Sequence, residues 1–279
     1  MLFLLLFLPC TEAVLRVIVA DTPVRRIGSK LYKEELLTDE YKDAKELAYD
    51  SASRNLYFMY MDDSIQNSGR AYVNVITKKS SKIYGIEKNK ATAVDHESGD
   101  VYFGSENGLY KYDPIENLAS NIGLFNINIF KIIIRSNAMY YIDADNHTIY
   151  KVLNNGKGTV KVANVDSVME FEVDFENRIH FVTMDGVFCL KNGEIIKNND
   201  INIVYHYISD ELKTFGVSDD GLYEVYCNGT AKRVADLDFF PKSIIFGDYG
   251  DIFYSSDNKI YRLKPIHKYT VYNIHRNTL

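Results

Sequence analysis

The sequence predicts an all-β fold: a six-bladed β-propeller with four antiparallel strands in each blade and an N-terminal strand that closes the ring. An aromatic strand segment recurs six times at intervals of 35–40 residues. A second β-rich run precedes each copy across a Gly, Asp or Asn turn, which is a hairpin signal. A constant period of this length indicates repeated structural units. The recurring aromatic residues are Tyr72, Tyr110, Tyr150, Phe188, Tyr223 and Tyr261.

Four strands are expected in each unit. The first is an apolar run, which suits an inner strand that is covered on both faces, and the fourth is more polar, as at 158–162 and 230–234. The expected inner strands are 47–49, 92–94, 132–134, 171–173, 206–208 and 244–246. The expected second strands are 56–58, 101–103, 139–141, 179–181, 213–215 and 252–254. Such a four-stranded unit is a propeller blade.

The last unit lacks a fourth strand of its own, and residues 29–37 carry the fourth-strand pattern ahead of the first unit. We expect this segment to complete the last blade, because an open ring leaves sheet edges and apolar blade faces exposed. An ordinary N-terminal strand or helix is the alternative. The propeller then covers 29–264, with a lead segment at 14–28 and a tail at 265–279.

The N-terminus indicates secretion. Leu2–Pro9 is a short apolar run, and Thr11-Glu12-Ala13 supplies a small-residue cleavage pattern, so 1–13 is expected to be a signal peptide. The run is much shorter than the roughly 20 residues of a membrane span. A buried N-terminal strand is the other interpretation. Two sequons, at Asn146 and Asn228, predict glycosylation of a secreted chain.

Removal of the signal peptide leaves two cysteines, Cys189 and Cys227. When blades four and five are superimposed on Gly186 and Gly221, the two cysteines have opposite strand parity, which permits a disulfide. Their offsets from these glycines differ and imply a shift of roughly 10 Å along the strand. Two buried free thiols therefore remain the alternative.

Composition and motifs exclude several function classes. The formal net charge of −6 comes with no basic cluster, so neither nucleic acid nor an anionic membrane is an expected partner. Nucleophile-elbow, phosphate-loop, dinucleotide-binding and HExxH motifs are absent from the sequence. We therefore expect no catalytic residue, metal ligand or cofactor. The acidic residues in the turns are interpreted as turn formers.

The blade sequences resemble those of the insect ommochrome-binding proteins, from about Leu31 to His267. The segments that carry the resemblance are 47–50 with 55–58, 100–103 with 108–111, and 250–254 with 259–261. The resemblance implies a secreted, non-enzymatic haemolymph carrier of an ommochrome, a planar aromatic pigment with carboxylate and amino groups. No ligand residue of the family can be placed on this chain.

Propeller topology suggests where such a ligand binds. Residues just before the inner strands and just after the second strands share one face near the axis. Aromatic rings there stack on a planar ligand, and Lys90 or Lys242 meets a carboxylate. The expected ligand-binding residues are Tyr60, Lys90, Phe130, Tyr205, His206, Phe240 and Lys242.

Two other function classes remain open. A calcium-dependent lactonase or gluconolactonase-like hydrolase shares the six-bladed plan, but it needs acidic and Asn side chains that converge in the central channel. A protein-binding propeller needs an exposed apolar patch and no deep pocket. The sequence leaves the oligomeric state open.

Overall fold

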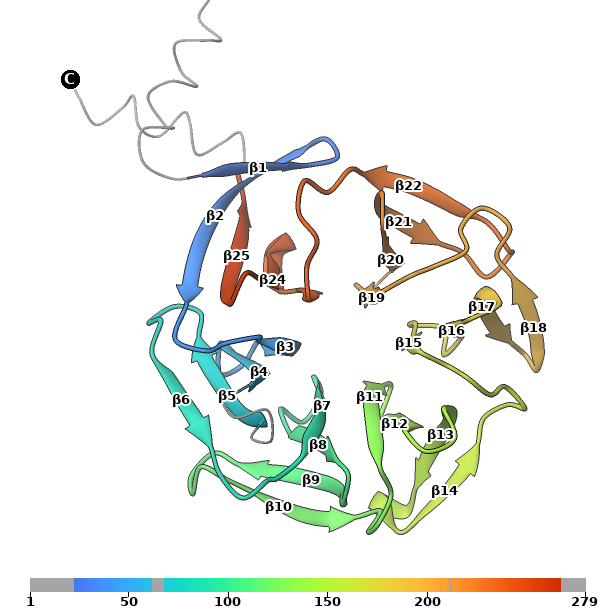
Figure 1. Cartoon of the computed structure of the whole chain (residues 1–279), viewed down its shortest axis with the longest axis horizontal. Helices are drawn as coiled ribbons and strands as arrows, with labels where there is room; N and C mark the ends of the chain where they lie inside the picture. Colours follow the sequence, from blue (N-terminus) through green and yellow to red (C-terminus); the bar gives the residue numbers. More distant parts are fainter. Residues whose placement is uncertain (1–22, 62–67, 211, 267–279) are drawn as a thin grey trace, which may run out of the picture.

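The computed structural model describes residues 23–61, 68–210 and 212–266, which form six antiparallel sheets around a central axis (Figure 1). Five sheets have four strands and the sixth has five. The predicted six-bladed propeller with four-stranded blades is confirmed. Within the described residues, no helix is long and apolar enough to cross a membrane.

Each of the first five blades runs outward from the axis in chain order. Blades one and two comprise β3 (Lys45–Asp50), β4 (Asn55–Met61), β5 (Ser68–Asn74) and β6 (Ser80–Ile83), then β7 (Asn89–Val94), β8 (Val101–Ser105), β9 (Gly108–Asp113) and β10 (Leu118–Gly123). Blade three comprises β11 (Ile129–Arg135), β12 (Ala138–Asp143), β13 (Thr148–Leu153) and β14 (Gly158–Lys161). Blades four and five comprise β15 (Glu170–Val173), β16 (Ile179–Thr183), β17 (Gly186–Lys191) and β18 (Glu194–Lys197), then β19 (His206–Ser209), β20 (Thr214–Ser218), β21 (Gly221–Val225) and β22 (Ala231–Ala235).

Blade six closes the ring. Its strands β23 (Ser243–Phe246), β24 (Ile252–Ser256) and β25 (Lys259–Pro265) come from the C-terminal part of the chain, and β2 (Lys30–Thr38) pairs antiparallel with β25. The predicted closing strand is therefore confirmed. A fifth strand, β1 (Val24–Ile27), pairs with β2 and was not expected from the sequence. This four-residue strand contains two arginines, so it carries no alternating apolar pattern that would mark it.

The core consists of side chains packed between neighbouring blades. Between blades two and three, the fully buried Ile129 and Ile132 lie in one cluster with Tyr141. The blades approach closely here: a Cβ added at Gly104 would lie 2.5 Å from the Ile129 Cγ2 atom. A larger residue at position 104 would therefore push these two blades apart.

The alternating strand directions define two faces of the propeller. Turns between second and third strands, and the connections that lead into the next inner strand, lie at one face, which we call the connection face. Turns between first and second strands and between third and fourth strands lie at the opposite face. The first residues of every inner strand are therefore nearest the connection face.

Candidate functional site

The inner strands surround a central cavity of about 150 Å³. Its lining includes apolar stretches, among them Ile132–Ile134 of β11 and Ile244–Phe246 of β23. Charged and polar side chains interrupt this surface: Glu46, His96, Lys131, Arg135, Glu172 and His206. A concave site that combines apolar side chains with convergent polar groups is compatible with small-molecule binding.

Three charged side chains meet near the connection face, and we call them the channel triad: Glu46, Lys131 and Glu170. The Lys131 Nζ atom lies 3.8 Å from Glu46 Oε2 and 3.2 Å from Glu170 Oε1. These residues come from blades one, three and four, so only closure of the ring brings them together. The triad places charges of both signs beside the cavity.

Burial determines the protonation of the triad. Desolvation raises the pKa of Glu170 to about 7, although the nearby Lys131 ammonium acts in the opposite direction. Desolvation also opposes the charged form of Lys131, but the Glu170 and Glu46 carboxylates outweigh it and hold the Lys131 pKa above its ordinary value. Lys131 is therefore charged at neutral pH, while Glu170 titrates there.

A second charged pair lies toward the opposite face. The Arg135 Nη2 atom is 3.6 Å from Glu172 Oε1, and Arg135 Nε donates a hydrogen bond of 3.0 Å to the Val173 carbonyl. Burial raises the pKa of Glu172. His96 lines the cavity, and burial, with a further contribution from Arg135, lowers the His96 pKa.

His206 connects the cavity to the connection face. Burial and then the Lys131 charge lower its pKa to about 4, so the imidazole is neutral at pH 7. Its Nε2–H donates to the Pro241 carbonyl over 3.2 Å, which leaves Nδ1 as an acceptor. The residue thus presents an uncharged polar group next to the channel triad.

Four of the expected ligand-binding residues gather where blade five meets blade six. Tyr205 and Phe240 pack edge to face, with ring centroids 5.2 Å apart, and 52% of Phe240 is exposed. A hydrogen bond to Asp219 raises the pKa of the Tyr205 hydroxyl. His206 follows Tyr205 directly, and Lys242, which bonds to Asp43, precedes the cavity-lining Ser243. We call Tyr205 and Phe240 the aromatic pair.

The other three expected residues lie apart from this group. Lys90 donates to Asn128 Oδ1 over 2.8 Å, and the half-exposed Phe130 ring lies 6.3 Å from that of His147. Both belong to inner strands across the axis from β19 and β23 (Figure 1). Tyr60 is buried against Tyr41, so its ring offers little area for a ligand to stack on.

Sequence reasoning missed the channel triad, although a signal was present. Lys131 interrupts the apolar run of β11, and Glu170 and Glu172 alternate with Phe171 and Val173 along β15. A charge inside an otherwise apolar inner strand is costly unless it is paired. Such residues therefore indicate partners across the axis, even before the partners can be identified.

The channel residues do not fit a calcium ion. Calcium takes about six to eight oxygen ligands, whereas Glu46 and Glu170 both contact the Lys131 ammonium, whose charge repels a metal ion placed between them. In the described part of the chain, one group of three His, Cys, Asp or Glu ligand atoms lies within 4.8 Å of one another: His180, Cys189 and Cys227.

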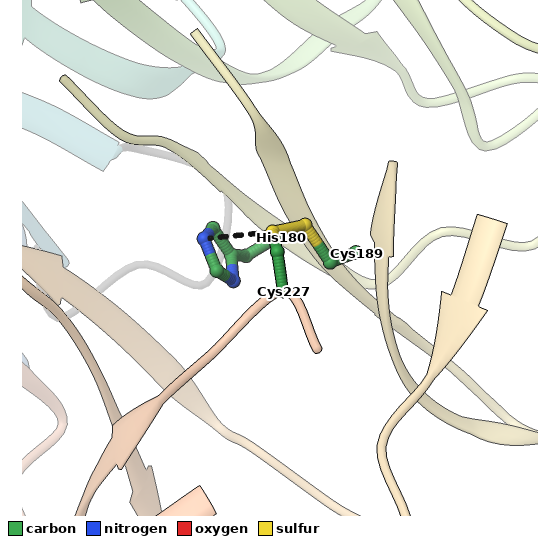
Figure 2. Close-up of side chains that lie close together, drawn as sticks. All are labelled: His180, Cys189 and Cys227. Atoms are coloured by element: carbon green, nitrogen blue, oxygen red, sulfur yellow. Dashed lines mark hydrogen bonds between the residues drawn. A yellow bond between two sulfur atoms is a disulfide. The ribbon is translucent and has the colours of Figure 1, made fainter. Parts of the chain in front are cut away.

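The two cysteines of that group form a disulfide, which joins β17 of blade four to the turn after β21 of blade five (Figure 2). Their Cα atoms are 5.2 Å apart, and the His180 Nε2 atom lies 3.6 Å from Cys227 Sγ. Disulfide sulfurs are not thiolates, so they do not bind a metal in this state.

Both sequon asparagines are exposed, Asn146 on the connection face and Asn228 beside Cys227 on the opposite face.

Comparison with known proteins places this geometry in context. No family model matches the chain. The chain is 25% identical over 248 residues to the Ommochrome-binding protein of Manduca sexta, which covers 86% of this chain and 90% of that protein. The similarity supports the resemblance expected from the sequence.

The solved structures that resemble the chain are propellers. A gluconolactonase from Xanthomonas campestris has a TM-score of 0.66 at 11% identity, over 89% of this chain and 96% of its own. Regucalcin, a calcium-binding protein from Agrobacterium tumefaciens, has a TM-score of 0.64 at 11% identity, over 83% of this chain and 93% of its own. At identities this low, the structural similarity shows a common fold alone.

Proposed function

We propose that this chain is a non-enzymatic carrier of a small planar aromatic molecule with carboxylate and amino groups, of the ommochrome type. The observation that carries the proposal is the sequence similarity, over most of both chains, to the Ommochrome-binding protein of Manduca sexta. The charge distribution of the cavity supports it, because the channel triad offers one cation and two carboxylates to a group that bears both signs.

The ligand is proposed to bind at the mouth of the channel on the connection face. The cavity of about 150 Å³ is smaller than the roughly 300–1,000 Å³ of typical ligand pockets. It therefore accommodates the amino-acid end of the ligand, with its carboxylate toward Lys131 and its ammonium toward Glu46 and Glu170. The ring system then stays outside against the aromatic pair, with Lys242 at its edge.

We expect the double substitution Tyr205→Ala and Lys242→Ala to raise the Kd for an ommochrome at least about tenfold, which corresponds to about 1.4 kcal/mol. It removes one ring of the aromatic pair and the adjacent ammonium. The chain contains no Trp, so the quenching of tyrosine emission can be used to measure pigment binding. The matched control is Tyr84→Ala with Lys191→Ala, two exposed residues outside this site. A titration curve that the first double variant leaves unchanged contradicts the proposed position of the ligand.

Turnover of a lactone by the purified chain contradicts the non-enzymatic role.

We also propose that the chain is secreted into haemolymph and loses residues 1–13, which lie outside the described residues. Mass spectrometry of the extracellular form should show a start near Val14 and glycans on Asn146 and Asn228. The exposure of both asparagines is compatible with modification. An extracellular chain that retains Met1 contradicts the processing.

A further inference from the structure

Four side chains between blades four and five form a compact buried group: Asp174, His180, Cys189 and Cys227 (Figure 2 shows the last three). All four are nearly inaccessible to solvent; His180 is 1% exposed. We propose that reduction of the Cys189–Cys227 disulfide converts this group into a binding site for Zn²⁺ or a similar thiolate-preferring divalent ion.

The distance between the imidazole nitrogen and one sulfur matches a tetrahedral site. With Zn–S bonds of about 2.3 Å and Zn–N bonds of about 2.0–2.1 Å, tetrahedral angles separate a sulfur and a nitrogen ligand by about 3.5 Å. The His180 Nε2 atom lies 3.6 Å from Cys227 Sγ, and the Cys189 sulfur lies within 4.8 Å of both. The nitrogen is already at a suitable distance from one sulfur, and the two sulfurs, about 2.05 Å apart in a disulfide, must separate after reduction to the roughly 3.8 Å of a tetrahedral site.

Asp174 is adjacent to His180 but is not among the three residues whose donor atoms all lie within 4.8 Å of one another, so its carboxylate must move toward the sulfurs to act as a fourth ligand. Its Oδ2 atom is 3.1 Å from His180 Nε2, while a tetrahedral site with a Zn–O bond of about 2.0–2.2 Å separates oxygen and nitrogen ligands by about 3.4 Å. The Arg178 Nε–H donates to the same Asp174 oxygen over 2.6 Å and orients the carboxylate, as outer-shell partners do in metal sites.

The imidazole faces the sulfurs through one nitrogen alone. His180 Nε2 points to both Asp174 and Cys227, while His180 Nδ1 is a buried polar atom with no partner among the described residues. Buried polar atoms without a partner are rare in native proteins. Because Nδ1 makes no hydrogen bond to the described residues, no such bond has to break when Nε2 binds a metal ion.

A metal ion can reach this group from the surface. A cavity of about 250 Å³ on the face opposite the connection face is lined by Asp174, His180 and Cys227. Reduction of the disulfide by a phosphine transfers two electrons to the sulfurs, with the phosphine becoming its oxide by taking oxygen from water. The two water protons yield two thiols, and the metal displaces both thiol protons into solvent as it binds the thiolates.

Co²⁺ titration of the phosphine-reduced chain without oxygen tests the proposal. We expect one equivalent of Co²⁺ to bind with a thiolate-to-cobalt charge-transfer absorption, which excess Zn²⁺ abolishes, and the oxidised chain to show no such band. His180→Gln should weaken binding at least tenfold, whereas His147→Gln, at an exposed imidazole, should leave it unchanged. Absence of the band, or equal binding by both variants, overturns the proposal.

A second measurement applies if reduction of the disulfide disrupts the tertiary packing. If the reduced chain loses its near-ultraviolet circular dichroism, Zn²⁺ should restore the signal in the original chain and fail to do so in His180→Gln. Equal restoration in both, or restoration in neither, overturns the proposal. The outcome is independent of pigment binding, because this group lies outside the channel mouth.

Discussion

Replacement of Lys131 by Met is expected to destabilise the folded chain by about 3–5 kcal/mol at pH 8, the usual cost of removing one partner of a buried ion pair. The substitution leaves the Glu46 and Glu170 carboxylates in the channel without the ammonium that lies 3.8 and 3.2 Å from them. Urea unfolding followed by circular dichroism measures the loss. A variant as stable at pH 8 as the original chain contradicts the triad.

The destabilisation should be smaller at pH 5. Burial raises the folded pKa of Glu170 to about 7, above the roughly 4.3 of an unfolded glutamate. Between these values the folded chain binds a proton that the unfolded chain does not, so the contribution of Glu170 to stability falls as the pH rises. Loss of Lys131 raises the folded pKa further, and a protonated Glu170 carries no charge to leave unpaired. The control variant, Lys131→Met with Glu170→Gln, should recover part of the stability lost at pH 8.

Removal of Val24–Thr38 is expected to abolish cooperative unfolding. Without β1 and β2, strand β25 becomes an open sheet edge, and the fully buried Leu263 and the nearly inaccessible Tyr254 lose the cover of the closing strands. Calorimetry should show no sharp transition. An unchanged melting temperature contradicts ring closure by this segment.

Two neighbouring leucines of β2 form a milder test of the same closure. Leu37 is 4% exposed and packs into the cluster at blades six and one, whereas Leu36 is 40% exposed. We expect Leu37→Ala to cost about 2–5 kcal/mol of unfolding free energy and Leu36→Ala much less.

The fold was readable from the sequence because each blade is a local structure. Its strands are consecutive along the chain and joined by short turns, so the same apolar and aromatic pattern recurs wherever a blade forms. The closing strand was also predictable. The C-terminal blade lacks a fourth strand, and the N-terminal segment supplies an extra strand that can fill this position. Strand β1 was not predictable, because four residues with two arginines carry no periodic signal.

The disulfide shows the limit of strand counting. A straight extension of the blade pattern implies a shift of roughly 10 Å between the two cysteines, yet their Cα atoms are 5.2 Å apart. The reason is that β21 ends at Val225 and the chain turns back, with the Tyr226 N–H bonded to the Thr230 carbonyl. Cys227 therefore lies in a turn rather than further along a strand.

The sequence by itself determined the six blades, their four-stranded order and the strand that closes the ring, because these depend on patterns within about 40 residues of chain and on the need to cover a sheet edge. Only the tertiary structure decided which side chains meet across the axis. Glu46, Lys131 and Glu170 belong to three different blades, and none of their own strands contains the partner that each one meets. Their contact depends on how closure of the ring orients the inner strands around the channel, which no local pattern encodes.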